Sequence, residues 1–313
     1  MSSSLAPDAA RDRRAGLIFG LSAYLLWGVL PLYFKALVHV SPGEILAHRI
    51  IWSLVFLTVL VTLWRRWASL KAALATRRVV LTLVASSVLI AINWLVYIMA
   101  VVSGHVLEGS LGYYLNPLVS ILLGVALLGE RLSKAQVFAT CLAGAGVAVL
   151  AVGAASGLWI SLTLAASFAL YGYLRKIVAV DALEGLSIET AMLAPIALGW
   201  IVYVDSTGQG GPGSWSWGTI FLLVAGGAIT AIPLLLFTAA ARRLPLSTMG
   251  FLQYIAPSLQ FLMAVILFGE HLTTAHLVCF GAIWTALAIV TIDGWRRAMR
   301  SRRAPALEAE SLV

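Results

Sequence analysis

Long apolar runs separated by short polar connections recur along the whole chain. A helix needs about 20 apolar residues to cross the hydrocarbon core of a bilayer, and most of these runs are of that length. We therefore predict ten membrane-spanning helices, at 16–38, 44–64, 79–101, 107–129, 135–153, 157–176, 187–204, 218–240, 246–268 and 275–294. The short connections leave no room for a soluble domain. The predicted fold class is an all-α integral membrane protein.

Composition indicates that lipid is the solvent for much of this surface. The chain of 313 residues is 61% hydrophobic and 11% charged, with a mean hydropathy of +0.97. Soluble domains are typically about 45–50% apolar and about 25% charged, so this chain cannot hide its apolar surface from water. Transmembrane strands would alternate apolar and polar positions, and the continuous runs therefore favour helices.

The basic residues are distributed unevenly around the predicted spans. With the N-terminus in the cytoplasm, all of the 21 Lys and Arg residues except Lys35 and Arg49 fall on the cytoplasmic side. Cytoplasmic loops of membrane proteins carry this excess, so we predict cytoplasmic tails at 1–15 and 295–313. The net charge of +8 then requires no nucleic acid, and the basic C-terminal tail is expected to lie against anionic lipid.

An internal repeat relates the two halves of the chain. Residues 114–135 align without gaps with residues 254–275. The matched residues include Tyr114 with Tyr254, Pro117 with Pro257, and Gly129–Glu130 with Gly269–Glu270. The offset covers five predicted helices, an odd number, so the copies run in opposite directions and predict two inverted five-helix units, 16–153 and 157–294. Many transporters bind substrate between such units; duplication for structural economy alone is the alternative.

Several stretches carry a resemblance to a known family. They are AYLLWGVLPLYFK (23–35), EILAHRIIWS (44–53), NWLVYIMAV (93–101), LEGSLGYYLNPL (107–118), SFALYGYLRK (167–176) and IPLLLFTAAARRLPLSTMGFLQYIAPSLQF (232–261). Together with both Gly-Glu pairs, they resemble the EamA-type transporters of the drug/metabolite transporter superfamily, and within it the subfamily of the chloramphenicol-sensitive protein RarD. The resemblance implies two EamA repeats, a location in the bacterial cytoplasmic (inner) membrane, and permease activity in the direction of export. It implies no particular substrate, because substrates vary widely across the superfamily.

Polar residues inside the spans mark the candidate site, because an ionisable group at the bilayer centre costs about 2.5–3.5 kcal/mol on insertion scales. In the first span, Tyr24, Trp27, Pro31 and Lys35 share one helical face. Pro31 frees a backbone carbonyl and requires a polar neighbour. Lys35 either faces this site or snorkels to the outer surface.

The second span begins with a cluster of charged residues. Glu44 and His48 are i, i+4 neighbours that can pair. They form either an outer gate or anion site with Lys35, or a capped helix start at the interface. Arg49 lies deeper, and we expect a carboxylate partner for it, either Glu44 or Glu108.

The third and fourth spans supply candidates for a cavity wall. These are Asn93, Trp94 and Tyr97 in the third span, and Glu108, Tyr113, Asn116 and Pro117 in the fourth. Glu108 is the candidate for proton coupling, because burial favours the protonated form of a carboxyl group. Its position near the outer end also suits a solvated residue.

The sixth and ninth spans complete the candidate set. In the sixth, Tyr171 lies one turn from Arg175, which also fits the basic cytoplasmic end of that span. The ninth contributes Gln253, Tyr254, Pro257 and Gln260. Its two glutamines provide either hydrogen-bonding groups for a polar solute or bonds between helices.

Glu130 and Glu270 follow the glycines at the ends of the fourth and ninth spans. We interpret each pair as a helix-end feature, in which the glycine stops one helix and the glutamate caps the next. A role in gating is the alternative.

Motifs for other chemistry do not occur in the sequence. It has no G-x-x-x-x-G-K-[ST] phosphate loop, no H-E-x-x-H and no G-x-S-x-G. We therefore expect no enzyme activity, no cofactor and no metal.

Our hypothesis is a secondary transporter that exports a small metabolite or drug-like solute by alternating access. Spans one, three, four, six, eight and nine are expected to line its central cavity. The proton is the candidate coupling ion, and both a monomer and a homodimer are compatible with the sequence. The alternatives are a passive channel, a non-transporting scaffold or sensor, and a membrane-embedded enzyme.

Overall fold

The computed structural model describes the chain except for residues 1–4, 103–105, 153–157, 209–214, 268–273 and 311–313. The described residues form α-helices joined by short turns, with no strand among them. The helices are α1 (Leu5–Ala36), α2 (Pro42–Leu63), α3 (Trp67–Ala75), α4 (Arg77–Val102), α5 (Val106–Leu128), α6 (Lys134–Ala151), α7 (Leu158–Ile177), α8 (Ala182–Ser206), α9 (Trp217–Arg243), α10 (Leu246–Gln253), α11 (Ile255–Ile266) and α12 (Thr274–Glu310). Each predicted span overlaps at least one helix, and the all-α fold class is confirmed.

Six apolar segments of these helices are long enough to cross a bilayer. They are Arg11–Ala36, Pro42–Leu63, Arg77–Tyr97, Ala182–Ser206, Trp217–Arg243 and Leu277–Arg296. Two shorter apolar helices cover Gly112–Leu128 and Lys134–Val149. The protein is therefore a multi-pass membrane protein, and the larger number of ten spans stays a prediction.

The helices differ from the predicted spans at their ends and at one break. α1 begins before residue 16 and α12 continues past residue 294, because helical hydrogen bonding does not stop where the apolar run stops. The predicted ninth span is divided at Tyr254 into α10 and α11. Pro257 explains this break, because it has no N–H to donate to the carbonyl of Gln253 four residues earlier.

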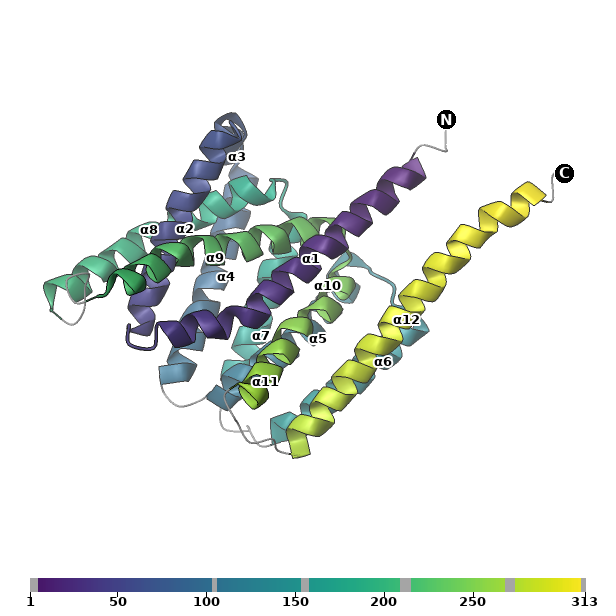
Figure 1. Ribbon diagram of the computed structural model, residues 1–313. Helices are drawn as coiled ribbons and strands as arrows, with labels where there is room; N and C mark the ends of the chain where they lie inside the picture. Colours follow the sequence, from purple (N-terminus) through teal and green to yellow (C-terminus); the bar gives the residue numbers. More distant parts are fainter. Residues whose placement is uncertain (1–4, 103–105, 153–157, 209–214, 268–273, 311–313) are drawn as a thin grey trace.

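The helices pack mainly between the two halves of the chain. α6 lies against α12, α1 against α9, α2 against α8 and α9, α4 against α7, and α5 against α7 and α10. Figure 1 shows α6 and α12 side by side at one flank, with the start of α1 and the end of α12 on the same side of the molecule. This interlocking arrangement brings residues from both halves to the centre.

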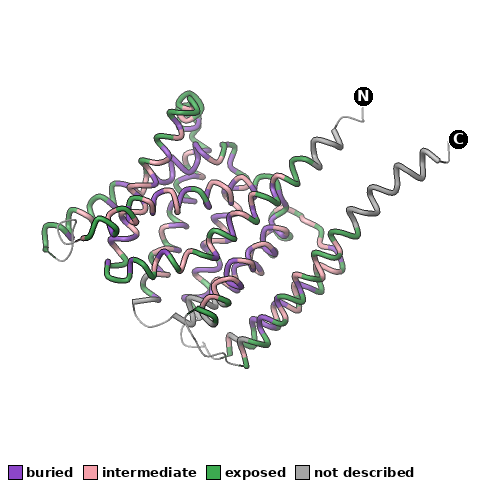
Figure 2. Tube along the Cα trace, in the orientation of Figure 1, coloured by how far each residue is buried: buried purple, intermediate pink, exposed green. Residues whose placement is uncertain are grey.

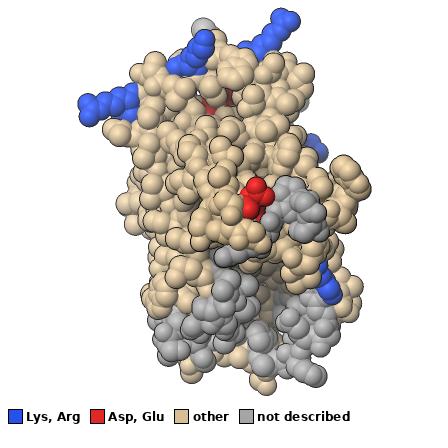
Figure 3. All heavy atoms as spheres, turned by 90° about the vertical axis from the view of Figure 1, so that its left-hand side faces the viewer, with Lys and Arg blue, Asp and Glu red and all other residues tan. Residues whose placement is uncertain are grey.

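The outer faces of the helices are apolar. Figure 2 shows exposed positions alternating with buried ones along the helices at the periphery, and Ile18, Val59, Leu81 and Ile196 are among the exposed large side chains. On the face drawn in Figure 3, the middle is largely uncharged and most Lys and Arg side chains gather at the upper end. Exposed tryptophans such as Trp64, Trp200 and Trp295 suit anchors at the headgroup level.

Candidate solute-binding cavity

A cavity of about 310 Å³ lies between the helices of both halves. It is lined by Tyr24, Trp27, Leu30, Pro31, Phe34, Arg49, Ile90, Asn93, Trp94, Tyr97, Tyr113, Asn116, Phe168, Thr230, Leu234, Gln253, Ala256, Pro257 and Gln260. These residues come from α1, α2, α4, α5, α7, α9, α10 and α11. The structure thus brings twelve of the sequence-predicted residues together and adds α2, through Arg49, to the walls.

Aromatic rings form much of the wall. The Trp27 ring lies 5.5 Å from Tyr24 and 5.8 Å from Phe168, measured between centroids. On another side, Tyr97 and Tyr113 meet edge to face at 5.4 Å. Aromatic pairs favour such tilted and edge-to-face arrangements, and their rings offer apolar surfaces to a ligand.

The amide side chains are partly used in holding the helices together. Asn93 Nδ2 donates to the carbonyl of Leu164 and to Ser167 Oγ, at 3.0 and 3.1 Å. Gln253 Nε2 donates to Ser120 Oγ at 3.2 Å. In contrast, Asn116 Oδ1 and Gln253 Oε1 are buried without a hydrogen-bond partner among the described residues. These two oxygens remain available to accept a hydrogen bond from a ligand.

The kinking proline of α1 explains one contact in the wall. Pro31 cannot donate to the carbonyl of Trp27, which lies four residues before it. Gln260 Nε2 from α11 donates to that carbonyl at 3.0 Å. Gln260 of the second half therefore satisfies the Trp27 carbonyl that Pro31 leaves without a helical donor. This is the polar neighbour that the sequence predicted for Pro31.

Arg49 is the cation of the cavity. Its Nε donates to Thr230 Oγ1 at 2.7 Å, and its guanidinium lies 5.3 Å from the ring centroid of Phe34. The expectation that Glu44 pairs with Arg49 is wrong: Glu44 accepts a hydrogen bond from Ser41 Oγ at 2.7 Å and forms no ion pair in the described part of the chain. The reason is local, because Ser41 and Glu44 face each other across the first turn of α2. The side chain of Glu108, the other expected partner, is outside the described residues.

The remaining residues of the expected outer gate lie away from the cavity. His48 packs against Trp215 at 5.4 Å between ring centroids, and no hydrogen bond or ion pair joins it to Glu44. Lys35 is exposed in the last turn of α1. Ser41 is the N-cap of α2 and binds Glu44, as a capped helix start requires, and the outer gate stays a prediction.

Three further candidates are buried outside the cavity. Tyr254 sits at the break between α10 and α11 and belongs to an apolar cluster with Tyr114 and Phe280. Pro117 lies where α5 meets α10, its carbonyl close to Gly250. Tyr171 lines an adjoining pocket of about 20 Å³, which shares four lining residues with the cavity and is large enough for about one water molecule.

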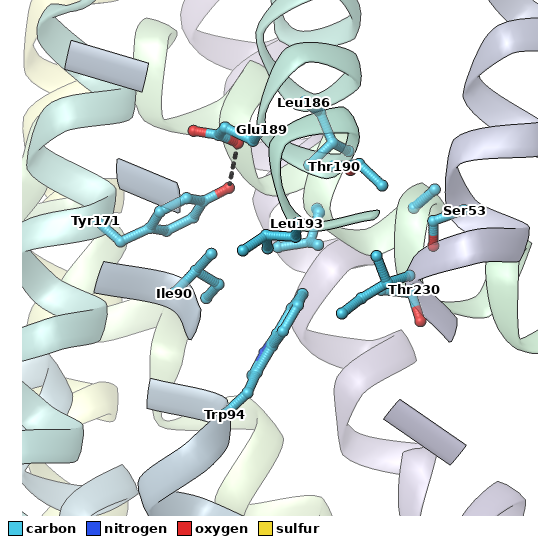
Figure 4. Close-up of a pocket in the computed structure, with 12 residues that line it drawn as sticks. Ser53, Ile90, Trp94, Tyr171, Leu186, Glu189, Thr190, Leu193 and Thr230 are labelled. Carbon is cyan, nitrogen blue, oxygen red and sulfur yellow. Dashed lines mark hydrogen bonds between the residues drawn. The ribbon is translucent and has the colours of Figure 1, made fainter. Parts of the chain in front are cut away.

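This small pocket contains a carboxylate that sequence reasoning missed. Figure 4 shows Glu189 of α8 accepting a hydrogen bond from Tyr171, at 3.4 Å. Ser86 of α4 also donates to Glu189, and Arg175 Nη1 lies 3.6 Å from its Oε1. The Arg175 and Glu189 side chains are 0% and 2% exposed, so Arg175 is an interior residue and not a cytoplasmic surface charge. The available signal was a glutamate at the third position of the predicted span 187–204.

Glu130 caps a helix, although not the one expected. Its carboxylate accepts from the backbone N–H of Ser247 at 2.9 Å and from Ser247 Oγ at 2.7 Å, at the start of α10. The next helix in sequence, α6, is instead capped by Ser133 and Gln136. Gly129 adopts a φ of +64°, as a glycine that ends a helix can, and this turn directs Glu130 towards the second half. Glu270 is outside the described residues.

A further group of ion pairs joins helices outside the cavity. Asp181 binds Arg242 at 2.6 Å and Arg66 at 2.5 Å, and Arg66 also reaches Glu184. Hydrogen bonds from Arg242, and then from Arg66, lower the pKa of Asp181 below its usual value. These residues connect the turn after α2, the start of α8 and the end of α9.

A multi-pass helical fold around an amphipathic central cavity defines the class of membrane transport proteins. A model of the EamA-like transporter family matches residues 14–152. An uncharacterized transporter of Vibrio cholerae serotype O1 is 44% identical over 300 residues, which cover 96% of this chain and 99% of that protein. Protein RarD of Escherichia coli (strain K12) is 45% identical over 284 residues, which cover 91% of this chain and 96% of that protein.

The chain belongs to the EamA-like transporter family, and the resemblance to RarD is confirmed. The crystal structure of another protein has a TM-score of 0.69 at 22% identity, and the match covers 90% of this chain and 98% of that one. At that identity it supports the fold alone. The protein is therefore a bacterial multi-pass membrane protein of a transporter family.

Proposed function

We propose that this protein is a secondary transporter that exports a small metabolite or drug-like solute through the central cavity by alternating access. Ten spans form two inverted five-helix units, 16–153 and 157–294, with both termini in the cytoplasm. The cavity carries this proposal, because rings and hydrogen-bonding groups from both units converge on it. Binding sites for small molecules combine mostly apolar walls with a few polar groups in this way.

The helix pairing supports the inverted arrangement. Each helix of the first unit has an equivalent in the second. The equivalent pairs are α1 and α7, α2 and α8, α4 and α9, α5 and α10 with α11, and α6 and α12. The contact of α1 with α9 then becomes that of α7 with α4, and the contact of α2 with α9 becomes that of α8 with α4. The pairs α2–α8, α5–α10 and α6–α12 each correspond to themselves. Two units packed in this symmetric way can rock between equivalent arrangements.

The packed segment of α1 between Asp12 and the cavity favours a carrier over a passive channel. On α1, cavity residues run from Tyr24 to Phe34, whereas Asp12 of the same helix is bound to Arg243 of α9 at 2.9 Å. Tyr24 lies twelve positions after Asp12 on the same helix, which is ~18 Å along the helix axis. Packed side chains and ion pairs occupy this length, and a transport cycle would have to open them.

Comparative mass spectrometry of culture medium tests the function. One strain expresses the intact protein, and a second expresses Asn93→Ala/Gln253→Ala, which removes polar groups from the wall. A third expresses Thr285→Ala, an exposed position on α12, as the matched control. We expect at least one compound to be enriched outside cells with the intact and control proteins only. If the concentrations of compounds in the medium are the same for all three strains and for cells without the protein, the result would support a scaffold or sensor instead. This comparison requires equal abundance of the three protein variants in the membrane.

Reconstituted liposomes separate the carrier from the channel. For an enriched compound, a carrier gives saturable flux that unlabelled solute on the opposite side accelerates. A channel gives flux that rises linearly and shows no exchange.

Cysteine labelling tests the orientation. Thr76, before α4, and Thr207, after α8, are exposed, and the proposed ten-span topology puts them on opposite sides of the membrane. In a background without Cys141 and Cys279, an impermeant maleimide added to intact cells is expected to label Thr207→Cys and not Thr76→Cys. The reverse pattern would place the termini outside.

A further inference from the structure

Arg49 is placed inside the cavity with unused hydrogen-bonding capacity. A guanidinium carries five N–H donors, and the only hydrogen bond of Arg49 in the described structure runs from Nε to Thr230 Oγ1. The side chain lines the cavity, and none of the ion pairs of the described residues includes it. The donors of its two terminal nitrogens are therefore available to a ligand.

The surroundings compensate this charge only in part. The Phe34 ring lies 5.3 Å away, and Tyr97 and Tyr113 are close enough to interact electrostatically with the guanidinium. Ring faces and hydroxyl groups stabilise a cation by fractions of what a paired carboxylate provides. A cation within a membrane protein normally has an anionic partner or water around it, and a ligand entering this cavity displaces water.

We propose that Arg49 binds the anionic group of the transported solute, and that the solutes are small organic anions with a flat apolar body. This inference rests on the proposed transport function and names the substrate class of the same cavity. Arg49 meets a carboxylate or a comparable oxyanion through two parallel N–H donors. The rings of Trp27, Tyr97 and Tyr113 take the apolar body.

Two buried amide oxygens of the cavity narrow the class of solutes further. Neither Asn116 Oδ1 nor Gln253 Oε1 accepts a well-formed hydrogen bond from the described residues, although the Tyr24 hydroxyl lies near Gln253. They lie on α5 and α10, whereas Arg49 lies on α2. A solute that carries a hydroxyl or N–H group besides its anionic group would pair with these oxygens as well as with Arg49, and a neutral or cationic analogue would leave Arg49 without an anionic partner.

The test compares export by the intact protein with export by Arg49→Gln, Arg49→Lys and Lys71→Gln. Lys71→Gln removes a cation from the exposed surface of α3 and serves as the control. Each exported acid is also compared with its methyl ester, which keeps the shape and removes the charge. Membrane abundance and melting temperature are measured for each variant, so that a folding defect is recognised. Arg49→Lys keeps the positive charge and loses the two parallel N–H donors. It therefore separates the contribution of the charge from that of the paired hydrogen bonds.

The expected result is that the enriched compounds are anions. Their export falls at least about tenfold with Arg49→Gln, less with Arg49→Lys, and not with Lys71→Gln, because only Arg49→Gln removes the charge-assisted hydrogen bonds to the anion altogether. Enrichment of neutral or cationic compounds, or equal export by Arg49→Gln, overturns the anion site and leaves the transport function in place. The same holds if methyl esters are exported as well as the acids. Absence of any enriched compound with the intact protein overturns both.

Discussion

At the scale of single residues, Arg49 and Arg175 lie among the described helices in opposite situations. Arg175 has Glu189 beside it and also donates to Thr238 Oγ1 and to the carbonyl of Ala182. Arg49 has one internal hydrogen bond and opens onto the cavity. The ion pair and hydrogen bonds of Arg175 hold helices in place, whereas a charge at a cavity wall without an ion pair among the described residues is suited to a ligand.

The Arg175–Glu189 pair is therefore expected to act as a unit in stability. Arg175→Met leaves the Glu189 carboxylate buried without its cation, which typically costs about 3–5 kcal/mol. The double variant Arg175→Met/Glu189→Gln removes both charges and is expected to be more stable than Arg175→Met. Unfolding of the purified protein in detergent measures both, with Glu189→Gln alone completing the cycle. Strictly additive losses would contradict the coupling.

At the scale of elements, close helix approach depends on small residues. Gly227 of α9 lies against the backbone of α2, where a Cβ would come within 3.0 Å of the Trp52 carbonyl and the Ser53 nitrogen. Ser53 Oγ also donates to the Gly227 carbonyl at 3.0 Å. This contact sets the separation of α2 and α9, and with it the distance from Arg49 to Thr230.

Gly227→Ala is accordingly expected to force α2 and α9 apart. Overpacking costs about 1–3 kcal/mol, so the melting temperature of the purified protein should fall. Gly199→Ala is the matched control, because nothing lies within 4 Å of a Cβ at that exposed position of α8. There, alanine improves helix propensity by roughly 0.5–1 kcal/mol. Equal effects of the two substitutions would show that α2 and α9 are not tightly held.

At the scale of the whole molecule, ion pairs join segments from both halves at one end. Asp181 bridges Arg66 of the first half and Arg242 of the second. The pKa of Asp181 is lowered in the folded protein, so the folded state binds fewer protons there than the unfolded state. The resulting stability is present above the ordinary aspartate pKa of about 3.9 and is lost as pH falls below it.

Stability is thus expected to decline in acid partly through this one residue. The melting temperature of the intact protein should fall between about pH 5 and pH 3 more steeply than that of Asp181→Asn. Asp205→Asn, at an exposed aspartate without an ion pair among the described residues, should follow the intact protein. Parallel curves for the intact protein and Asp181→Asn would show that the bridge does not contribute.

The sequence by itself determined the helices, the multi-pass membrane class and the family. Burial in lipid is a property of consecutive residues, so runs of apolar side chains predict it without knowledge of contacts. The polar residues that interrupt those runs also indicated most of the polar cavity wall, including Asn93 and Gln260. They did so because a polar group within a span must face protein or water.

Only the tertiary structure decided which groups meet. Glu130 caps a helix that begins 116 residues later, Ser86 reaches Glu189 across 103 residues, and Arg49 finds Thr230 instead of Glu44. The break at Tyr254, which ends α10, likewise separates two helices that one apolar run predicts as continuous. Such partners depend on the packing of distant helices, and periodicity along one helix gives its face without naming what lies opposite.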